Sequence, residues 1–182
     1  MLHKTLTYIT GQLNEYLRLR FRLTNDIAFL APPKESGNAI SSNRVGISMV
    51  GVERETGAGI SFNRQQVSDG QSKRSAPGWQ LNIFILFAAV FRDKQYEESL
   101  QILSGILSFI QKNNVITIQE SGITFSIEPV NLSFHEQSNL WGICGGTYYP
   151  SIICKLRMLT VDEQEILDLS SVIGNEELTI DS

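Results

Sequence analysis

The chain has 182 residues, 42% hydrophobic and 19% charged, which suffices to bury the core of one globular domain and excludes a disordered or fibrous protein. Its formal net charge of −4 argues against nucleic acid as a partner, because phosphate binding relies on an excess of clustered Lys and Arg. Two cysteines, Cys144 and Cys154, make no disulfide framework, and the N-terminal residues lack the apolar run of a signal peptide, so we expect synthesis in the cytoplasm.

The N-terminal segment predicts an amphipathic helix over residues 2–19. Apolar side chains recur there at spacings of three, four and seven, which places them on one helix face: Leu2, Leu6, Ile9, Leu13, Tyr16 and Leu17. Arg18, Arg20 and Arg22 follow near the end of this helix, where we interpret them as solvated groups that complement the helix dipole.

Two strands and a polar segment are predicted next. A short strand at 26–31 precedes a proline pair, and a longer strand begins at Arg44. Residues 55–78 are rich in Gly, Ser, Gln and Asn without sustained periodicity, which predicts a long loop or an extended hairpin. Three basic residues leave two interpretations open for this segment, contact with an acidic partner or a mobile linker: Arg64, Lys73 and Arg74.

Residues 79–91 form the strongest predicted strand. Their apolar side chains fall on both faces, which indicates a central strand of a sheet that is covered on both sides. The apolar run 83–91 is about half as long as a membrane-spanning helix requires, so we expect no direct membrane insertion.

The second half of the chain predicts one more long helix and three strands. The helix covers 95–112, and the side expected to be buried carries Tyr96, Leu100, Leu103, Leu107 and Ile110. Strands follow at 115–119, 123–132 and 152–160, and Pro129 in the second of these suggests a sheet edge or a bulge.

This order of elements predicts an α+β fold with a single mixed, mainly antiparallel sheet and two main helices packed on it. We expect the domain to span residues 1–161 and residues 162–182 to form an acidic tail or arm. The tail holds seven acidic and no basic residues, which is typical of a solvated, mobile terminus and also of an arm that docks on a basic neighbour. In the docking interpretation the contacts include Asp162, Glu163 and Glu165.

The segment SFHEQSNLWGICGGTYYPS, residues 133–151, resembles an active site in composition but fails tests of spacing. A zinc-binding helix needs His-Glu-x-x-His, and His135 has no second histidine at that spacing. The glycine pair Gly145 and Gly146 lacks the context of a phosphate-binding loop. A nucleophile pair of Cys144 and His135, as in a cysteine hydrolase, is a remote alternative. We therefore predict no catalytic residue, no metal and no cofactor, and no enzymatic activity.

A structural interpretation accounts for the same segment. Ser133 followed three residues later by Glu136 is the signature of a capping box at a helix start. A short helical turn with Leu140 and Trp141 then follows, and the glycine pair reverses the chain into the last strand. We expect replacement of Trp141 by Ala to damage folding or assembly, and replacement of His135 by Ala or Cys144 by Ser to be nearly silent.

Three stretches of this sequence resemble one known family. They are TLTYITGQLNEYLRLRF, LNIFILFAAVF followed by YEESLQILSGILSFIQ, and VNLSFHEQSNLWGICGGTYYPSIICKLRML. Together, from about residue 2 to about residue 161, they are similar to the N-terminal domain of tail terminator, or cap, proteins of contractile injection systems of the antifeeding-prophage and virulence-cassette type. The motif residues that carry the resemblance, and to which it assigns packing or interface roles, are Leu140, Trp141, Gly142, Gly145, Gly146, Tyr149 and Pro150.

The resemblance implies a structural role. Such subunits join as a ring, expected to be six-fold, at the distal end of the inner tube, stop its growth and hold the last layer of the sheath. The implied partners are other copies of this chain, the inner-tube protein and the sheath protein, with a second cap homologue left open. The particle would assemble in the cytoplasm, and its later release or membrane association is left open too. The alternative of a different class is a monomeric binding module that acts through the 55–78 loop.

Overall fold

A computed structural model describes residues 2–32, 43–55, 64–67, 71–75, 79–119, 122–161 and 166–171. The chain divides into two compact units, Met1–Arg54 with Leu81–Leu159 and Glu55–Gln80 with Thr160–Ser182. None of the helices in the described part of the chain is long and apolar enough to span a membrane.

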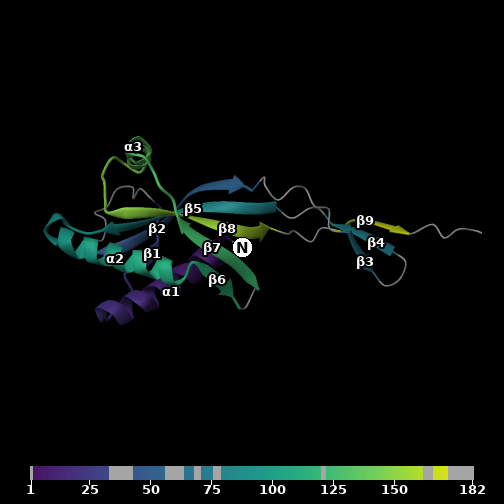
Figure 1. Cartoon of the computed structure of the whole chain (residues 1–182), viewed down its shortest axis with the longest axis horizontal. Coiled ribbons are helices and arrows are strands. Elements are labelled where there is room, and N and C mark those ends of the chain that lie inside the picture. The colour runs from purple at the N-terminus through teal and green to yellow at the C-terminus, as the bar shows by residue number, and fades with distance from the viewer. Residues whose placement is uncertain are drawn as a thin grey trace, which may run out of the picture. The chain divides into compact units, whose positions relative to one another are not determined.

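The first unit is built on a six-stranded sheet (Figure 1). Its strands, in spatial order, are β1 (Ala28–Leu30), β2 (Arg44–Arg54), β5 (Trp79–Val90), β8 (Ser151–Val161), β7 (Ile123–Pro129) and β6 (Val115–Ile118). β1 is parallel to β2, whereas β2 with β5, β8 with β7 and β7 with β6 are antiparallel. The predicted α+β fold with a mixed, mainly antiparallel sheet is confirmed, as is the central place of the 79–91 strand.

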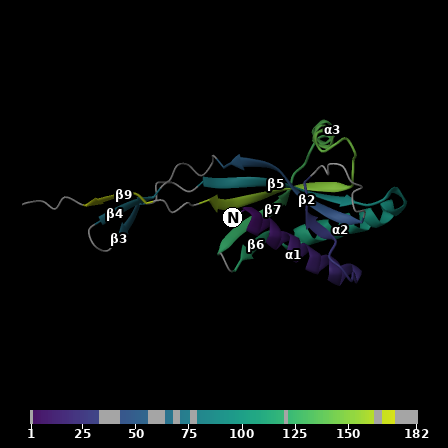
Figure 2. The ribbon, with the colours of Figure 1, turned by 180° about the vertical axis from the view of Figure 1, so that it is seen from behind.

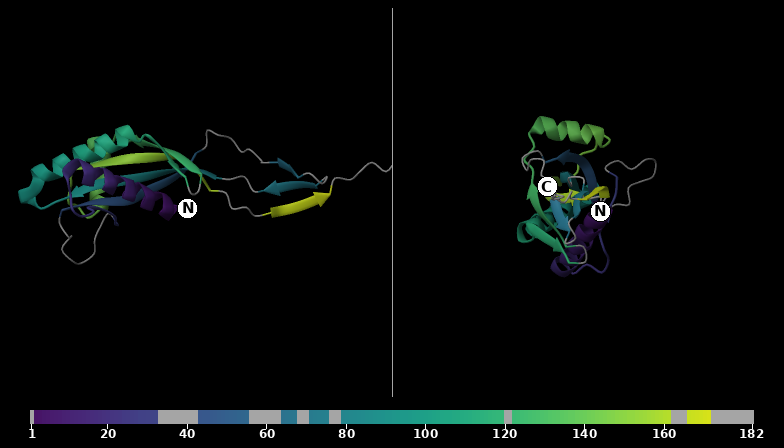
Figure 3. Two further views of the ribbon diagram at one scale, coloured as in Figure 1. Left: turned by 90° about the horizontal axis from the view of Figure 1, so that it is seen from below. Right: turned by 90° about the vertical axis from the view of Figure 1, so that its right-hand side faces the viewer.

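Helices cover both faces of this sheet. α1 (Leu2–Phe21) and α2 (Tyr96–Lys112), the latter preceded by the short 3-10 turn Asp93–Gln95, lie on one face, and α3 (Phe134–Ile143) lies on the other (Figures 1 and 2). The view along the sheet in Figure 3 shows α3 and α1 on opposite sides of the strands. Strand β5 explains this arrangement, because its odd-numbered side chains pack toward α1 and α2 and its even-numbered ones toward α3.

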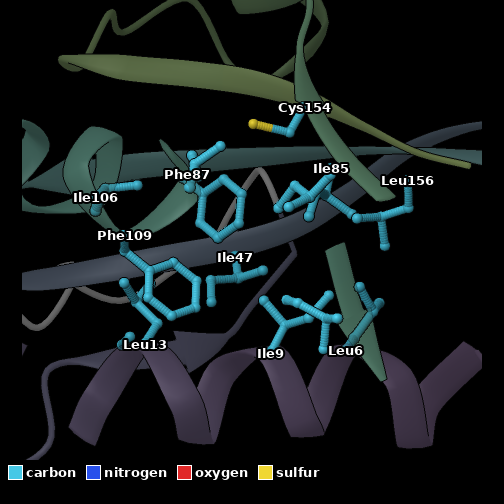
Figure 4. Packing of buried hydrophobic residues seen from close by; sticks show 14 of the residues in the cluster. Leu6, Ile9, Leu13, Ile47, Ile85, Phe87, Ile106, Phe109, Cys154 and Leu156 are labelled. Carbon is cyan, nitrogen blue, oxygen red and sulfur yellow. The ribbon is translucent and has the colours of Figure 1, made fainter. Parts of the chain in front are cut away.

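The main core lies between the sheet and the first two helices (Figure 4). Its largest fully buried side chains include Ile9 and Leu13 of α1, Ile106 of α2, and Ile85 and Phe87 of β5. Each such side chain contributes roughly 1.5–3 kcal/mol on burial. The apolar stripe predicted for the first helix is therefore confirmed from Leu6 to Leu17, where its leucine and isoleucine side chains are buried.

The predicted buried side of the second helix is wrong for three of its five residues. Tyr96, Leu100 and Leu107 are exposed, while Ile102, Ile106 and Phe109 face the core. The helix carries two apolar stripes, and Gly105 decides between them. A Cβ atom placed on Gly105 would lie 2.7 Å from Phe21 Cε2, so the glycine face of α2 packs closely against α1.

A buried asparagine joins α1 to the edge of the sheet. Asn14 Oδ1 accepts hydrogen bonds from the backbone N–H groups of Ile27, at 3.1 Å, and Ala28, at 2.8 Å. Its Nδ2 donates to the Ala28 carbonyl oxygen at 2.8 Å. The side chain thus satisfies backbone groups on the open side of β1, where they have no neighbouring strand.

Pro129 does not mark an edge strand, because β7 lies between β8 and β6. It is the last residue of β7 and pairs in register with Cys154 of β8. The N–H of Ile127 donates to the carbonyl oxygen of Asn114 on the β6 side, and by alternation the proline nitrogen two residues later faces the same side, beyond the start of β6. The missing donor of Pro129 therefore breaks no ladder hydrogen bond.

The second unit contains a three-stranded antiparallel sheet in the order β3 (Arg64–Val67), β4 (Gln71–Ser75) and β9 (Ile166–Ser171). Of the two structures predicted for 55–78, an extended hairpin is present in β3 and β4. A strand from the acidic tail pairs with it, and Arg74 and Asp168 are register partners. The remaining parts of the loop and the tail (56–63, 68–70, 76–78, 162–165 and 172–182) lie outside the described residues.

The close approach at Gly105 leads to a stability prediction. Replacement of Gly105 by Leu should lower the free energy of unfolding by about 1–3 kcal/mol, because the new side chain has to displace Phe21 and Leu17. Gly11 of α1 is the matched control: a Cβ atom there would meet nothing within 4 Å, and Gly11→Leu should be neutral or stabilising by up to ~1 kcal/mol. Urea unfolding followed by circular dichroism measures both, and equal effects would contradict the packing described.

Candidate functional site

The candidate site is α3 with the loop that follows it, residues 133–151. The helix starts at a capping box, as predicted: the Ser133 N–H donates to Glu136 Oε2 at 2.8 Å, and the Glu136 N–H donates to Ser133 Oγ at 3.3 Å. The backbone N–H of Ser133, and then its hydroxyl, hold the pKa of Glu136 below its usual value. The charge at this helix start therefore serves to fix the first turn.

Trp141 anchors α3 to the sheet. It is buried together with Leu86 and Ala88 of β5, Ile153 of β8 and Cys144. Its ring meets two tyrosines of the following loop nearly edge to face, Tyr148 at 5.7 Å and Tyr149 at 5.9 Å between ring centroids. Leu140 and Tyr149 pack against the same cluster as partly buried residues.

The glycine pair ends the helix and reverses the chain. Gly145 and Gly146 have φ angles of +108° and +83°, in the region that favours glycine. The Gly146 N–H donates to the Trp141 carbonyl oxygen at 2.7 Å, which satisfies one of the last carbonyl groups of α3. Pro150 directly precedes β8, and its carbonyl oxygen accepts from the Ala89 N–H of β5 at 2.9 Å.

Several large apolar side chains of this site point away from the sheet. The exposed fraction is 91% for Phe134, 81% for Ile143 and 56% for Tyr148. An open groove of about 400 Å³ lies beside Tyr148, between the 147–150 loop and residues 89–99 at the end of β5 and the start of α2. This combination of exposed aromatic and aliphatic groups suits contact with another protein better than binding of a small polar ligand.

The geometry does not support a cysteine nucleophile. His135 and Cys144 lie at opposite ends of α3, nine residues apart, which corresponds to roughly 13 Å along the helix axis. Burial raises the pKa of the Cys144 thiol, and burial raises the pKa of Cys154 to about 12. A raised pKa lowers the thiolate fraction, and the thiolate is the reactive form. In the described part of the chain no cluster of three or more His, Cys, Asp or Glu side chains could hold a metal ion.

The predicted partner-contact residues fall in two places. Arg64 lies on β3 and Lys73 and Arg74 lie on β4, all in the second unit. Asp162, Glu163 and Glu165 lie outside the described residues. Their role in binding stays a prediction, as does an assembly role for the motif residues of the α3 segment.

Two features of the surface were missed from the sequence. One is the outward apolar side of α2, whose signal was the second apolar stripe on that helix. The other is the exposure of Phe134 and Ile143, which the aromatic and aliphatic composition of the segment did not distinguish from core residues.

The fold of this chain is also found in two solved proteins. One is the sheath/tube terminator of PVC, an extracellular contractile injection system, in its extended state, with a TM-score of 0.66 and 17% sequence identity over 94% of this chain and 62% of that chain. The other is the tube terminating cap of the anti-feeding prophage, with a TM-score of 0.56 and 11% identity over 91% of this chain and 60% of that chain. No curated relative matches the chain by sequence.

The fold is thus that of tail terminator proteins, and the resemblance seen in the sequence is confirmed. The chain belongs to the Pvc16 N-terminal domain family, which it matches over residues 4–174. It spans less than two thirds of the length of either solved terminator.

The packing of Trp141 leads to a prediction on stability. Trp141→Ala should lower the free energy of unfolding by about 3–5 kcal/mol, because it opens a cavity between α3 and β5. Trp141→Phe should cost clearly less, since it keeps a ring in the cluster and removes the indole N–H, which is buried without an acceptor among the described residues. Thermal and urea unfolding measure the three proteins.

His135→Ala serves as the matched control on the same helix. His135 is exposed, so its replacement should change stability by no more than ~0.5 kcal/mol. Cys144→Ser, expected from the sequence to be silent, should instead cost about 1 kcal/mol or more, because the buried site would enclose a hydroxyl group. A Trp141→Ala protein as stable as the His135→Ala protein would show that α3 does not depend on this anchor.

Proposed function

We propose that this chain is a structural cap of a contractile injection system. In this role it ends the growth of the inner tube and sheath at the distal end and anchors the last sheath layer. The observation that carries the proposal is the match to the Pvc16 N-terminal domain family over residues 4–174, nearly the whole chain. The fold shared with a sheath/tube terminator and with a tube terminating cap supports it.

The α3 segment fits a role without catalysis. The site is organised by a capping box, an anchored tryptophan and a glycine turn, and its most exposed large apolar side chains are Phe134 and Ile143. The proposed partners are the tube protein, the sheath protein and other copies of the chain, which would form a closed ring. Assembly would take place in the cytoplasm, where these components are made.

A reconstitution with the cognate tube and sheath proteins tests the cap. With the chain present, negative-stain images should show tubes of limited length with extra density at one end. Tubes formed without it should be longer and more variable in length, because nothing blocks addition of the next tube ring. The same length distribution and bare ends in both preparations would overturn the proposed function.

The acidic tail leads to a second expectation in this assay. Truncation before Asp162 removes seven acidic residues together with β9 and should leave the six-stranded sheet folded, because the truncated residues belong to the second unit. Attachment of the sheath to the capped end should weaken, since an arm that docks on a basic neighbour is lost. The fraction of particles that keep their sheath measures this effect.

A variant without three of the tail's charges separates the contribution of charge to sheath attachment from that of the chain itself. Replacement of Asp162, Glu163 and Glu165 by their amides keeps the length of the chain and removes three negative charges. If the tail acts by charge, this variant should lose part of the sheath attachment at low salt, and its difference from the unmodified chain should shrink at high salt, where charges are screened. Sheath attachment equal to that of the unmodified chain in both variants would remove the tail from the proposal.

A further inference from the structure

The second unit pairs two segments that are far apart along the chain and opposite in charge. Strands β3 and β4, with the sequences RQQV and QSKRS, hold three basic residues and no acidic one. Strand β9 belongs to the tail from residue 162, which holds seven acidic residues and no basic one. Attraction between unlike charges therefore favours the pairing of the tail with this hairpin.

The pairing of β9 with β4 has a defined register. Five register pairs join the two antiparallel strands, and one of them places Arg74 opposite Asp168. Opposite charges at facing positions of an antiparallel pair stabilise it. A slip by one residue would place Arg74 opposite Leu167 or Leu169 instead, so the charges favour the register that is present.

The hairpin depends on a third strand. Among the nine residues of β3 and β4, Val67 alone is apolar. A two-stranded hairpin is at best marginally stable in water and needs a further strand or a packed helix. The described part of the second unit contains no helix, so this support comes from β9, which brings Ile166, Leu167 and Leu169.

The strand that supports a hairpin need not come from the same copy of the chain. Every copy carries the same β9, so the tail of a second copy offers β4 the same five register pairs. Within the described residues β9 has a single neighbour, β4, so its release breaks the pairing along one edge only. Exchange of an identical element between protomers is a low-cost route to association.

The length of the connection restricts such an exchange to adjacent copies. Four residues separate the end of β8 at Val161 from the start of β9 at Ile166, which spans at most roughly 18 Å when extended. A neighbour held next to this copy presents its β4 at a high effective concentration, which favours pairing between the two chains.

We propose that adjacent copies of this chain exchange their tail strands, so that β9 of one copy pairs with β4 of the next. Each copy then donates one strand and accepts another through a different surface. Contact between different surfaces of identical copies is head-to-tail, and it closes into a ring when the rotation between neighbours allows it. The inference rests on the proposed ring-forming cap and names the segment that links its copies.

Cysteine variants of the full chain test the exchange. Ser72 and Ser170 are register partners, and the Cα atoms of facing residues in an antiparallel pair are roughly 4.5–5.5 Å apart, which suits a disulfide. Ser72→Cys and Ser170→Cys are made in separate chains, which are mixed in concentrated solution and oxidised. Neither chain holds both introduced thiols, so each disulfide between them joins two copies. Non-reducing gel electrophoresis and mass spectrometry of the linked peptides measure the yield.

A mixture of Ser75→Cys and Ser170→Cys chains is the matched control for random collisions. Ser75 pairs with Ile166, four residues from Ser170, which corresponds to roughly 13 Å along the strand and exceeds the reach of a disulfide. The mixture with Ser72→Cys should therefore give at least about 10-fold more linked chains than the control mixture. Equal yields in the two mixtures would overturn the exchange.

Two further variants check the charge and the native thiols. Asp168→Lys, added to the Ser170→Cys chain, should lower the yield about threefold, because like charges then face each other at Arg74. The unmodified chain should give no linked copies on oxidation, because Cys144 and Cys154 are buried and burial raises the pKa of both thiols.

A chain that carries both Ser72→Cys and Ser170→Cys distinguishes exchange from closure within one copy. Exchange should give linked oligomers of this variant, whereas a linked monomer as the only product would overturn the inference. Tube capping is measured separately on the unmodified chain. Capped tubes without linked copies would refute the exchange and leave the cap standing, whereas linked copies without an effect on tube length would refute the cap and leave the exchange standing.

Discussion

Strand β5 carries apolar side chains on both faces, and the rest of the first unit follows from the need to cover both. Ile83, Ile85 and Phe87 point to one side, and Leu86 and Ala88 point to the other. An uncovered row of such residues would leave a large apolar area in water, at a free-energy cost of roughly 25 cal/mol per Å² of exposed apolar surface. The helices α1 and α2 cover the first face with a large core, and α3 covers the second mainly through Trp141.

The need to cover the second face of β5 explains the residues of the α3 segment. The segment combines a histidine, a cysteine, a tryptophan and a glycine pair, a composition that suggests an active site. In this fold the cysteine, the tryptophan and the glycine pair have structural roles, and the histidine has none. Trp141 fills the cover over β5, Cys144 packs beside it, and Gly146 turns the chain back toward β8. His135 is exposed at the first turn, far along the helix from the thiol.

The elements of the first unit were predictable because their signals are local. Periodicity along the chain locates α1, β5 and α2, and the spacing of Ser133 and Glu136 locates the start of α3. The orientation of α2 was not predictable from its own sequence, since two apolar stripes compete on it. Contact of Gly105 with Phe21 decides the outcome, and that pair is 84 residues apart in sequence, so no local pattern contains it. The hydrogen bonds between the Asn14 side chain and the backbone of Ala28 in β1 were not predicted, for the same reason.

Charged residues are unevenly distributed along the chain. Two long stretches of the first unit, 99–111 and 137–154, carry no charged side chain, whereas the tail from residue 162 holds seven acidic ones. Charged surface keeps a protomer soluble and opposes nonspecific association, while uncharged surface lowers the cost of burying a contact. If charges were spread evenly, every face would resist burial to a similar degree. Their absence from these two stretches lowers the cost of burying the surface of α2 between Glu98 and Lys112 and the surface of α3 after Glu136.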